Sequence, residues 1–364
     1  MKTNKLIPLI LTAALALSAC ASAANSATAA ASAETAAATP EPTAAPEPVG
    51  ELHALAETGQ NKFGNVICQT CPALDDEGNF TGTVIYKTDP DARQTTALYE
   101  YNDSAYSTLY QFLANDTLYV VMYRYDSDTK LLAVPLDGGE VWEIPIETYD
   151  VLGVADGGIV TSRIVSDYPI PLPSDAEMLS AIMQNSTYEF DLTDPATVRP
   201  IKKIFEYPCD GAPEGDGYIT YTYAGKNGSD FYFIADHMTP SYWTGSSVLC
   251  IHSDGTQEDL GIMTAQKFIR PMHQNEALRW FMVPNDDTPR TYTFYDLQGN
   301  EIGHNAAPAG VDVALIIEYL LDDGRVVLTL GGDPAHNYAA NYATIPADAF
   351  LNESTEYTEM EFVG

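Results

Sequence analysis

One hairpin pattern recurs along the chain and restricts its fold more than any other feature. It consists of an apolar run, a turn rich in Asp, Gly or Pro, and a second short apolar run. Apolar runs separated by such turns are typical of antiparallel hairpins. The turns fall near residues 89, 137, 194, 254, 298 and 348, so the period is roughly 45–60 residues. The pattern occurs at 83–99, 131–144, 188–201, 248–262, 292–303 and, weakly, 342–354.

Residues 108–145 show what one repeat contains. Four apolar runs are separated by turn signals, at Thr108–Leu113, Thr117–Tyr125, Lys130–Leu136 and Val141–Ile144. Four short strands in a repeat of this length are the signature of a β-propeller blade. The sequence therefore predicts an all-β propeller of about six four-stranded antiparallel blades, with seven as the alternative. A pair of β-sandwiches stays open, because its strands have a similar spacing of roughly 8–12 residues.

One segment interrupts the repeat. Within 168–185, Ser174 followed by Glu177 forms a capping box, and apolar residues then follow at helical spacing. We expect a short inserted helix near 175–184, packed against the rim of a sheet or bound to a partner.

The first twenty residues look like an export signal. Two lysines precede the apolar run Leu6–Leu17, which is shorter than the roughly 20 residues of a membrane-spanning helix. The run leads to Leu17-Ser18-Ala19-Cys20, which resembles the Leu-[Ser/Ala]-[Ala/Gly]-Cys box of bacterial lipoprotein signals. The resemblance implies removal of residues 1–19, acylation of Cys20, and anchoring in the lipid bilayer at the outer face of the bacterial cell membrane. An ordinary secretory signal is the alternative.

The next segment is a tether. Residues 20–50 consist almost entirely of Ala, Ser, Thr, Pro and Glu, which cannot bury enough apolar surface to fold. Residues 51–364 are then the propeller domain. Over about 60–364 the tyrosine-rich Asp-Gly repeats resemble those of bacterial surface lipoproteins with a degenerate β-propeller. That resemblance implies a fold and no particular ligand.

The chain is strongly acidic. It has 51 acidic against 17 basic residues and a net charge of −34. Such a charge repels phosphate backbones, so we expect no nucleic-acid partner. It also argues against flat binding on an anionic membrane. We interpret the charge as serving solubility rather than the capture of cations.

Four cysteines follow Cys20: Cys68, Cys71, Cys209 and Cys250. An even number outside the cytoplasm permits disulfides, and three pairings are open. We favour Cys68–Cys71 and Cys209–Cys250, because each pair closes a local unit. A redox role for the Cys-x-x-Cys at 68–71 is disfavoured, since a proline rather than a helix follows it.

No motif for a catalytic centre, cofactor or metal ion stands out. The sequence lacks Gly-x-Ser-x-Gly, His-Glu-x-x-His, phosphate-binding glycine loops and Asp-x-Asp-x-Asp-Gly calcium loops. Its six histidines are scattered, and its acidic pairs lie in turns, where Asp is favoured for local reasons. We therefore predict no catalytic residue, no cofactor and no metal ligand.

The long connections between strands should share one face. In a meander with strands A to D from the axis outward, B–C connections lie with the D–A crossings, and A–B and C–D turns lie opposite. The segments 164–186, 236–247, 284–291 and 331–341 all fall between B and C. Binding residues gather in long loops on a rigid scaffold. We expect ligand contacts from Tyr168, His237, Tyr242, Trp243, His336 and Tyr338, above all from Tyr242 and Trp243.

These features favour a non-enzymatic binding or scaffold propeller with an unknown protein or glycan partner. One alternative is a propeller enzyme acting on extracellular glycan or peptide, which needs a concave pocket with convergent ionisable groups. The other is a structural subunit of an envelope complex, which needs a large exposed apolar patch.

Overall fold

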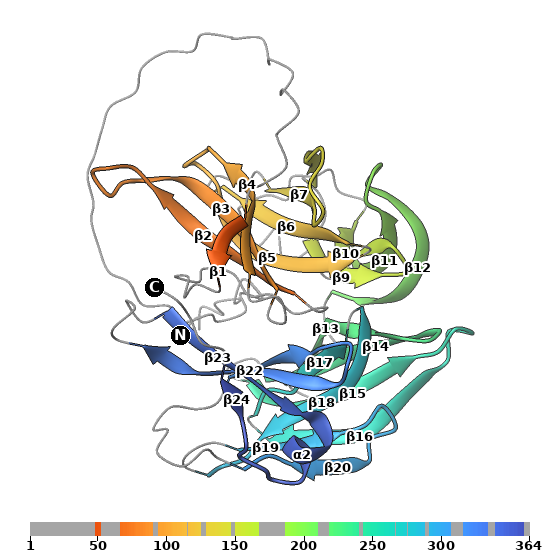
Figure 1. Ribbon diagram of the computed structural model, residues 1–364. Coiled ribbons are helices and arrows are strands. Elements are labelled where there is room, and N and C mark those ends of the chain that lie inside the picture. Colours follow the sequence, from red (N-terminus) through yellow and green to blue (C-terminus); the bar gives the residue numbers. More distant parts are fainter. Residues whose placement is uncertain are drawn as a thin grey trace, which may run out of the picture.

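Antiparallel strands make up almost all of the regular secondary structure among the described residues (Figure 1), as the hairpin repeat predicts. The computed structural model describes residues 48–51, 66–89, 94–114, 116–124, 129–146, 150–166, 186–209, 218–239, 243–265, 267–274, 276–287, 291–306, 316–333 and 339–359. Within these ranges there is one short helix, α2 (Ala347–Leu351). No helix in the same ranges has the length and apolar character needed to cross a bilayer.

The strands form six four-stranded antiparallel units, three of which are separate sheets. The first unit contains β1 (Pro48–Glu51), β2 (Ile67–Leu74), β3 (Phe80–Asp89) and β4 (Gln94–Tyr101). The second contains β5 (Ser107–Ala114), β6 (Thr117–Tyr123), β7 (Thr129–Pro135) and β8 (Trp142–Pro145). The third contains β9 (Asp150–Ala155), β10 (Gly158–Val165), β11 (Thr187–Asp194) and β12 (Arg199–Pro208).

The last three units are joined into one 12-stranded sheet by one residue pair between the fourth and fifth units and one between the fifth and sixth. The fourth unit contains β13 (Tyr218–Asn227), β14 (Asp230–Met238), β15 (Trp243–Ile251) and β16 (Gln257–Ala265). The fifth contains β17 (Arg270–Gln274), β18 (Ala277–Pro284), β19 (Tyr292–Tyr295) and β20 (Glu301–His304). The sixth contains β21 (Ile316–Leu320), β22 (Arg325–Asp333), β23 (Ala339–Pro346) and β24 (Thr358–Glu359).

Hydrophobic clusters fill the spaces between successive units, and this packing identifies the fold. In β6, Leu118, Val120 and Met122 pack with the first unit. Tyr119 and Val121, which point the other way, pack with the third. A sandwich buries only one face of each sheet, whereas a propeller blade buries both. The six-bladed propeller prediction is therefore confirmed, and the alternative of paired sandwiches is wrong.

The first blade differs from the others in its strand positions. The Tyr101 ring, at the end of β4, lies 4.7 Å from the Lys130 ammonium at the B–C end of the second blade. Lys87 in β3 reaches the opposite end, where its Nζ donates to the carbonyl of Leu136 over 2.6 Å. Strand β3 therefore runs toward the C–D end and β4 toward the B–C end, which are the directions of strands C and D in a blade. Strands β2, β3 and β4 thus take positions B, C and D, and β1 pairs with the outer edge of β4. No described strand pairs with the inner edge of β2.

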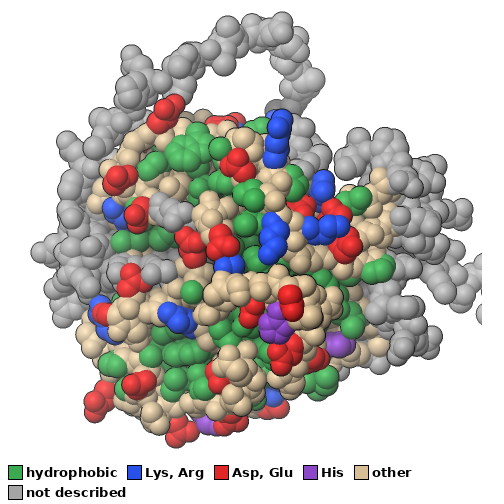
Figure 2. Space-filling model, turned by 90° about the vertical axis from the view of Figure 1, so that its right-hand side faces the viewer, with side chains coloured by type: hydrophobic (Ala, Val, Ile, Leu, Met, Phe, Trp, Pro, Cys, Tyr) green, Lys and Arg blue, Asp and Glu red, His purple; other side chains and the backbone are tan. Residues whose placement is uncertain are grey.

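The tight C–D turns of the third, fourth and fifth blades are built in the same way. In each turn the side chain of an aspartate accepts, through its Oδ1, a hydrogen bond from the backbone N–H two residues later. The aspartates are Asp194 in the third blade, Asp254 in the fourth and Asp296 in the fifth. This Asx turn explains why the recurrent hairpin carries Asp at its turn. Acidic side chains are scattered over the side of the molecule drawn in Figure 2 rather than gathered into one patch. Part of the negative charge thus follows from turn formation.

The four cysteines correct a sequence prediction, because all of them are thiols and not halves of disulfides. Cys68 and Cys71 both belong to strand β2. Residues three apart in a strand lie about 10 Å apart and point to opposite faces, whereas a disulfide needs Cα atoms within about 7 Å. The local pairing inferred from the short spacing is therefore wrong, since that spacing lies in a strand and not in a turn.

Other predictions fall partly or wholly outside the described residues. The helix near 175–184, the signal at 1–19 and Cys20 lie outside them. Strand β1 begins at Pro48, three residues before the domain boundary at 51 that composition indicated. Pairing with β4 makes a strand of Pro48–Glu51, although this Pro-Val-Gly-Glu segment has no strand signal of its own.

Candidate functional site

The long connections occupy equivalent places in four successive blades. They join β10 to β11, β14 to β15, β18 to β19, and β22 to β23, which are the B and C strands of the third to sixth blades. The topology therefore places the strand ends that these connections join on the same side as the D–A crossings, on what we call the long-loop face. One contact demonstrates this arrangement. Trp243, at the start of a C strand, stacks on Phe268 in the D–A crossing that precedes β17.

The Trp243–Phe268 pair is the most prominent aromatic feature of this face. The two ring centroids are 4.3 Å apart, and the ring planes are inclined by only 10°. Phe268 is 59% exposed, whereas Trp243 is partly buried beneath it. The ring offered to a ligand is thus mainly that of Phe268, and Trp243 supports it from below.

Polar groups under Trp243 hold the strand ends in place. Ser246 donates its hydroxyl to Asp236 Oδ1 over 2.5 Å. Burial raises the pKa of Asp236, and the hydrogen bond from Ser246 opposes that rise. Trp243 Nε1 is buried and makes no hydrogen bond to the described residues. A Cβ on Gly245 would lie 1.9 Å from the Thr264 carbonyl oxygen, so only glycine allows β15 and β16 to approach here.

His237 lies close to these groups in sequence but makes different contacts. Its Nε2 is 2.9 Å from the hydroxyl of Ser247. Thr244 donates its hydroxyl to the His237 carbonyl over 2.9 Å. Neighbouring residues of a strand point to opposite faces, so His237 and Asp236 do not share a hydrogen-bonded triad with one serine. The histidine therefore links strands β14 and β15 through its contact with Ser247.

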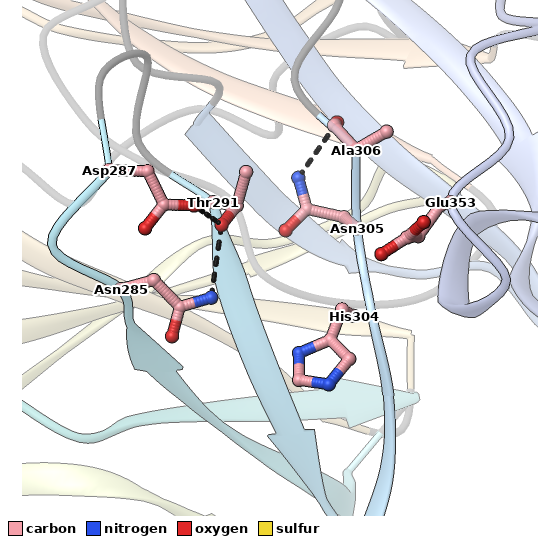
Figure 3. Close-up of a pocket in the computed structure, with 7 residues that line it drawn as sticks. All are labelled: Asn285, Asp287, Thr291, His304, Asn305, Ala306 and Glu353. Atoms are coloured by element: carbon pink, nitrogen blue, oxygen red, sulfur yellow. Dashed lines mark hydrogen bonds between the residues drawn. The ribbon is translucent and has the colours of Figure 1, made fainter.

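A polar hollow of about 370 Å³ opens at the long-loop end of the fifth blade (Figure 3). Asn285, Asp287 and Thr291 come from its B–C connection, and His304, Asn305 and Ala306 come from the end of β20, with Glu353 beside them. Two carboxamides, two carboxylates, a hydroxyl and an imidazole therefore line one space. Such groups suit a ligand rich in hydroxyls, because each can donate or accept hydrogen bonds.

Hydrogen bonds fix these lining residues before any ligand arrives. Asn285 donates Nδ2–H to the Thr291 hydroxyl over 2.9 Å, and its Oδ1 accepts from Thr293 over 3.0 Å. Asn305 is only 2% exposed, and its Oδ1 accepts the backbone N–H of Tyr292 over 2.7 Å. Preorganised groups of this kind lower the entropic cost of binding.

One ion pair connects the hollow to the aromatic pair. Lys267, next to Phe268, places its Nζ 3.0 Å from Asp286 Oδ2, and Asp286 is next to Asp287 of the hollow. The stacked rings of the fourth blade and the hollow of the fifth are thus linked through this ion pair, and we treat the two together as one candidate site, which we call the blade 4–5 site.

The predicted contacts are only partly placed by the structure. Trp243 belongs to the blade 4–5 site, and His237 lies behind it. Tyr168, Tyr242, His336 and Tyr338 lie outside the described residues. The sequence reasoning missed Phe268, Asn285 and Asn305. The available signal for Phe268 was its place in a D–A crossing, which the meander puts on the same face as the B–C connections. The prediction took aromatic residues from the B–C connections alone.

The sequence reasoning also missed a group of potential metal ligands at the opposite end of the fourth blade. Asp230, Cys250 and His252 place one donor atom each within 4.8 Å of one another. Cys250 and His252 are two residues apart in sequence, and this Cys-x-His spacing was the available signal.

Comparison with known proteins finds only distant structural similarities. No family model and no curated protein matches the sequence. An α-L-arabinanase structure from Penicillium chrysogenum has 10% identity, with 84% of this chain and 100% of that chain covered and a TM-score of 0.47. A prolyl endopeptidase has 11% identity, with 86% and 44% covered and a TM-score of 0.45. A puromycin-hydrolyzing peptidase from Mycobacterium tuberculosis has 12% identity, with 80% and 44% covered and a TM-score of 0.39.

The chain thus spans less than half the length of these two peptidases. All three TM-scores are below 0.5, so none of the printed activities is carried over to this chain. What the fold and the blade 4–5 site define is a class: a six-bladed β-propeller with a polar hollow beside an exposed aromatic ring.

Proposed function

We propose that this protein is a membrane-anchored, extracytoplasmic propeller that binds a glycan at the blade 4–5 site without transforming it. One observation carries the proposal: an exposed ring, Phe268, stacked on Trp243, and an ion pair that links it to a hollow lined by fixed carboxamides and by two carboxylates. The apolar face of a sugar ring packs on an aromatic ring, while its hydroxyls bond to amides and carboxylates.

The test is a glycan microarray probed with the full-length, detergent-solubilised protein, followed by calorimetry with the best ligand. We expect Phe268→Ala to weaken binding about tenfold, which corresponds to ~1.4 kcal/mol and to the upper range for one aromatic contact. Phe80→Ala is the matched control, because Phe80 is an exposed phenylalanine in the first blade. Equal affinity for Phe268→Ala and the parent would refute the proposed site.

Hydrolysis of the same glycan is the second candidate function, because Asp287 and Glu353 bring two carboxylates to one hollow. Glycosidases use two such groups, one on each side of the scissile bond. Incubation of the bound glycan with the protein, followed by assay of new reducing ends, separates the two functions. Products that disappear in Asp287→Asn and Glu353→Gln would establish catalysis, and an intact glycan would support binding alone.

A further inference from the structure

A second polar cluster lies on the fourth blade at the end opposite the blade 4–5 site, near its C–D turn. Asp230 begins β14, Cys250 lies near the end of β15, and His252 directly follows that strand. Residues two apart in a strand share a face, which places Cys250 with His252. Phe231 pairs with Ile251, so the antiparallel register brings Asp230 opposite His252. The backbone therefore directs three different donor groups to one place.

The distances between these donors suit a shared ion. His252 Nδ1 lies 3.3 Å from Asp230 Oδ2 and 3.8 Å from Cys250 Sγ, and all three donor atoms lie within 4.8 Å of one another. Metal–nitrogen and metal–oxygen bonds of about 2.0 Å and a metal–sulfur bond of about 2.3 Å give tetrahedral ligand separations of roughly 3.3–3.5 Å. Only small shifts of the side chains would be needed to enclose an ion.

A fourth residue occupies the place expected of a group that orients a metal-binding histidine. Glu258 Oε2 lies 3.1 Å from His252 Nε2, the ring nitrogen that faces away from Cys250 and Asp230. Metal-binding histidines usually donate their second N–H to a carboxylate, which fixes the ring and leaves the other nitrogen free to coordinate. Glu258 would thus hold Nδ1 in its coordinating form.

We propose that Asp230, Cys250 and His252 bind a divalent transition-metal ion of the zinc class, with Glu258 as the positioning residue for His252. The mixed sulfur, nitrogen and oxygen donor set favours zinc over calcium or magnesium, which prefer oxygen ligands alone. Binding replaces the proton of the Cys250 thiol by the metal, and the proton passes to solvent. The side chains of Asp230 and His252 are 29% and 33% exposed, so an ion can enter from solvent, and water can fill the fourth position.

A simpler explanation of the cluster involves no metal. Hydrogen bonds to Asp230 and Glu258 raise the pKa of His252, as in a histidinium held between two carboxylates. In that arrangement Cys250 is only a buried thiol, and its removal leaves the ion pairs intact. The role of the sulfur therefore distinguishes the two explanations.

The experiment titrates the full-length, metal-stripped protein with Co²⁺ and then with Zn²⁺. We expect one Co²⁺ per chain, a near-ultraviolet thiolate-to-cobalt charge-transfer band, and loss of that band when Zn²⁺ displaces the cobalt. Cys250→Ser should abolish the band, and His252→Gln should lower the affinity at least tenfold. Glu258→Gln should cost about 10–100-fold, as expected for a carboxylate that orients a ligand.

Matched controls make the outcome decisive. His304 is bonded to Glu301 over 2.8 Å, so His304→Gln breaks a similar histidine–carboxylate pair elsewhere and should leave metal binding unchanged. Cys209→Ser removes another thiol and should also have no effect. His252 is partly exposed, so His252→Gln keeps the test valid if Cys250→Ser does not fold. Absence of the band in the parent, or unchanged Zn²⁺ affinity in His252→Gln, would overturn the proposal, whatever the result of the glycan experiment.

Discussion

At the scale of single residues, aspartate has a structural role that composition alone does not reveal. Asp194 and Asp254 each accept a backbone N–H two residues ahead and a threonine hydroxyl close by. The side-chain hydrogen bond, from Thr197 or Thr256, is the largest cause of the lowered pKa of each carboxyl, and the backbone N–H adds to it. These aspartates are favoured in the ionised form because the turns supply donors.

This pKa shift predicts a pH-dependent contribution of Asp194 to stability. Its folded pKa is lowered, so the ionised group stabilises the protein above the unfolded value of about 3.9, and this is lost as the pH falls through the folded pKa. We expect Asp194→Asn to lower Tm at pH 7 and the difference from the parent to shrink as the pH falls below about 3.9, as measured by calorimetry from pH 7 to pH 3. Glu140→Gln, at an exposed residue between β7 and β8, controls for the loss of one charge. A Tm difference that stays constant over this range would contradict the assignment.

At the scale of elements, the strands and clusters in which the cysteines lie determine whether their thiols can react. Cys68 is fully buried in the cluster between the first two blades, and burial raises the pKa of its thiol to about 12. Cys250 is buried in the cluster between the fourth and fifth blades, and burial raises its pKa to about 11. A thiol that is both buried and protonated reacts slowly with oxidants. Packing thus keeps these cysteines reduced even where the compartment permits disulfides.

The cysteine arrangement is open to a direct chemical check. The protein is exported to an oxidising compartment, unfolded without reductant and alkylated with iodoacetamide. Mass spectrometry then locates the alkylated cysteines. We expect adducts on all four of Cys68, Cys71, Cys209 and Cys250, because each is a thiol in the folded state. Prior reduction should add nothing. Adducts that appear on two or more of these residues only after reduction would show that a disulfide forms.

Strand positions were predictable where the local pattern was strong. The four runs identified at 108–145 correspond to β5, β6, β7 and β8, with ends that differ by at most two residues. Here alternation, valine and tyrosine content and turn chemistry all agree. In the last blade the pattern at 342–354 was weak, and α2 follows β23 where a hairpin was expected. The apolar residues there fit either structure, and packing of Phe350 into the cluster with Phe294 selects the helix.

At the scale of the whole molecule, the blades form a series in which each one packs on its neighbours. Five hydrophobic clusters lie between successive blades. The two candidate sites both lie on the fourth blade, the blade 4–5 site at its long-loop end and the Cys250 cluster at its turn end. A rigid scaffold of this kind can hold two independent sites, because neither requires the blades to move.

The anchoring of this scaffold is a further prediction at the same scale. If Cys20 carries the acyl chains, Cys20→Ser should abolish labelling with a fatty-acid probe and release the protein from membranes, because a single cysteine supplies the anchor. The measurement compares membrane and soluble fractions of cells that express the parent and the variant. Cys209→Ser is the control and should stay in the membrane fraction. A Cys20→Ser protein that is still membrane-bound and labelled would show that Cys20 is not the anchor.

The sequence by itself determined the strands, their hairpins and the number of blades, because alternation and turn chemistry act between residues that are close along the chain. It also determined which segments would be long connections. Only the tertiary structure decided which side chains meet, since Trp243 and Phe268 are brought together by a crossing between blades. The same holds for Asp230 and His252, which meet through the register of β14 and β15. Such contacts depend on how sheets pair and pack, and no local pattern in a single sequence records that geometry.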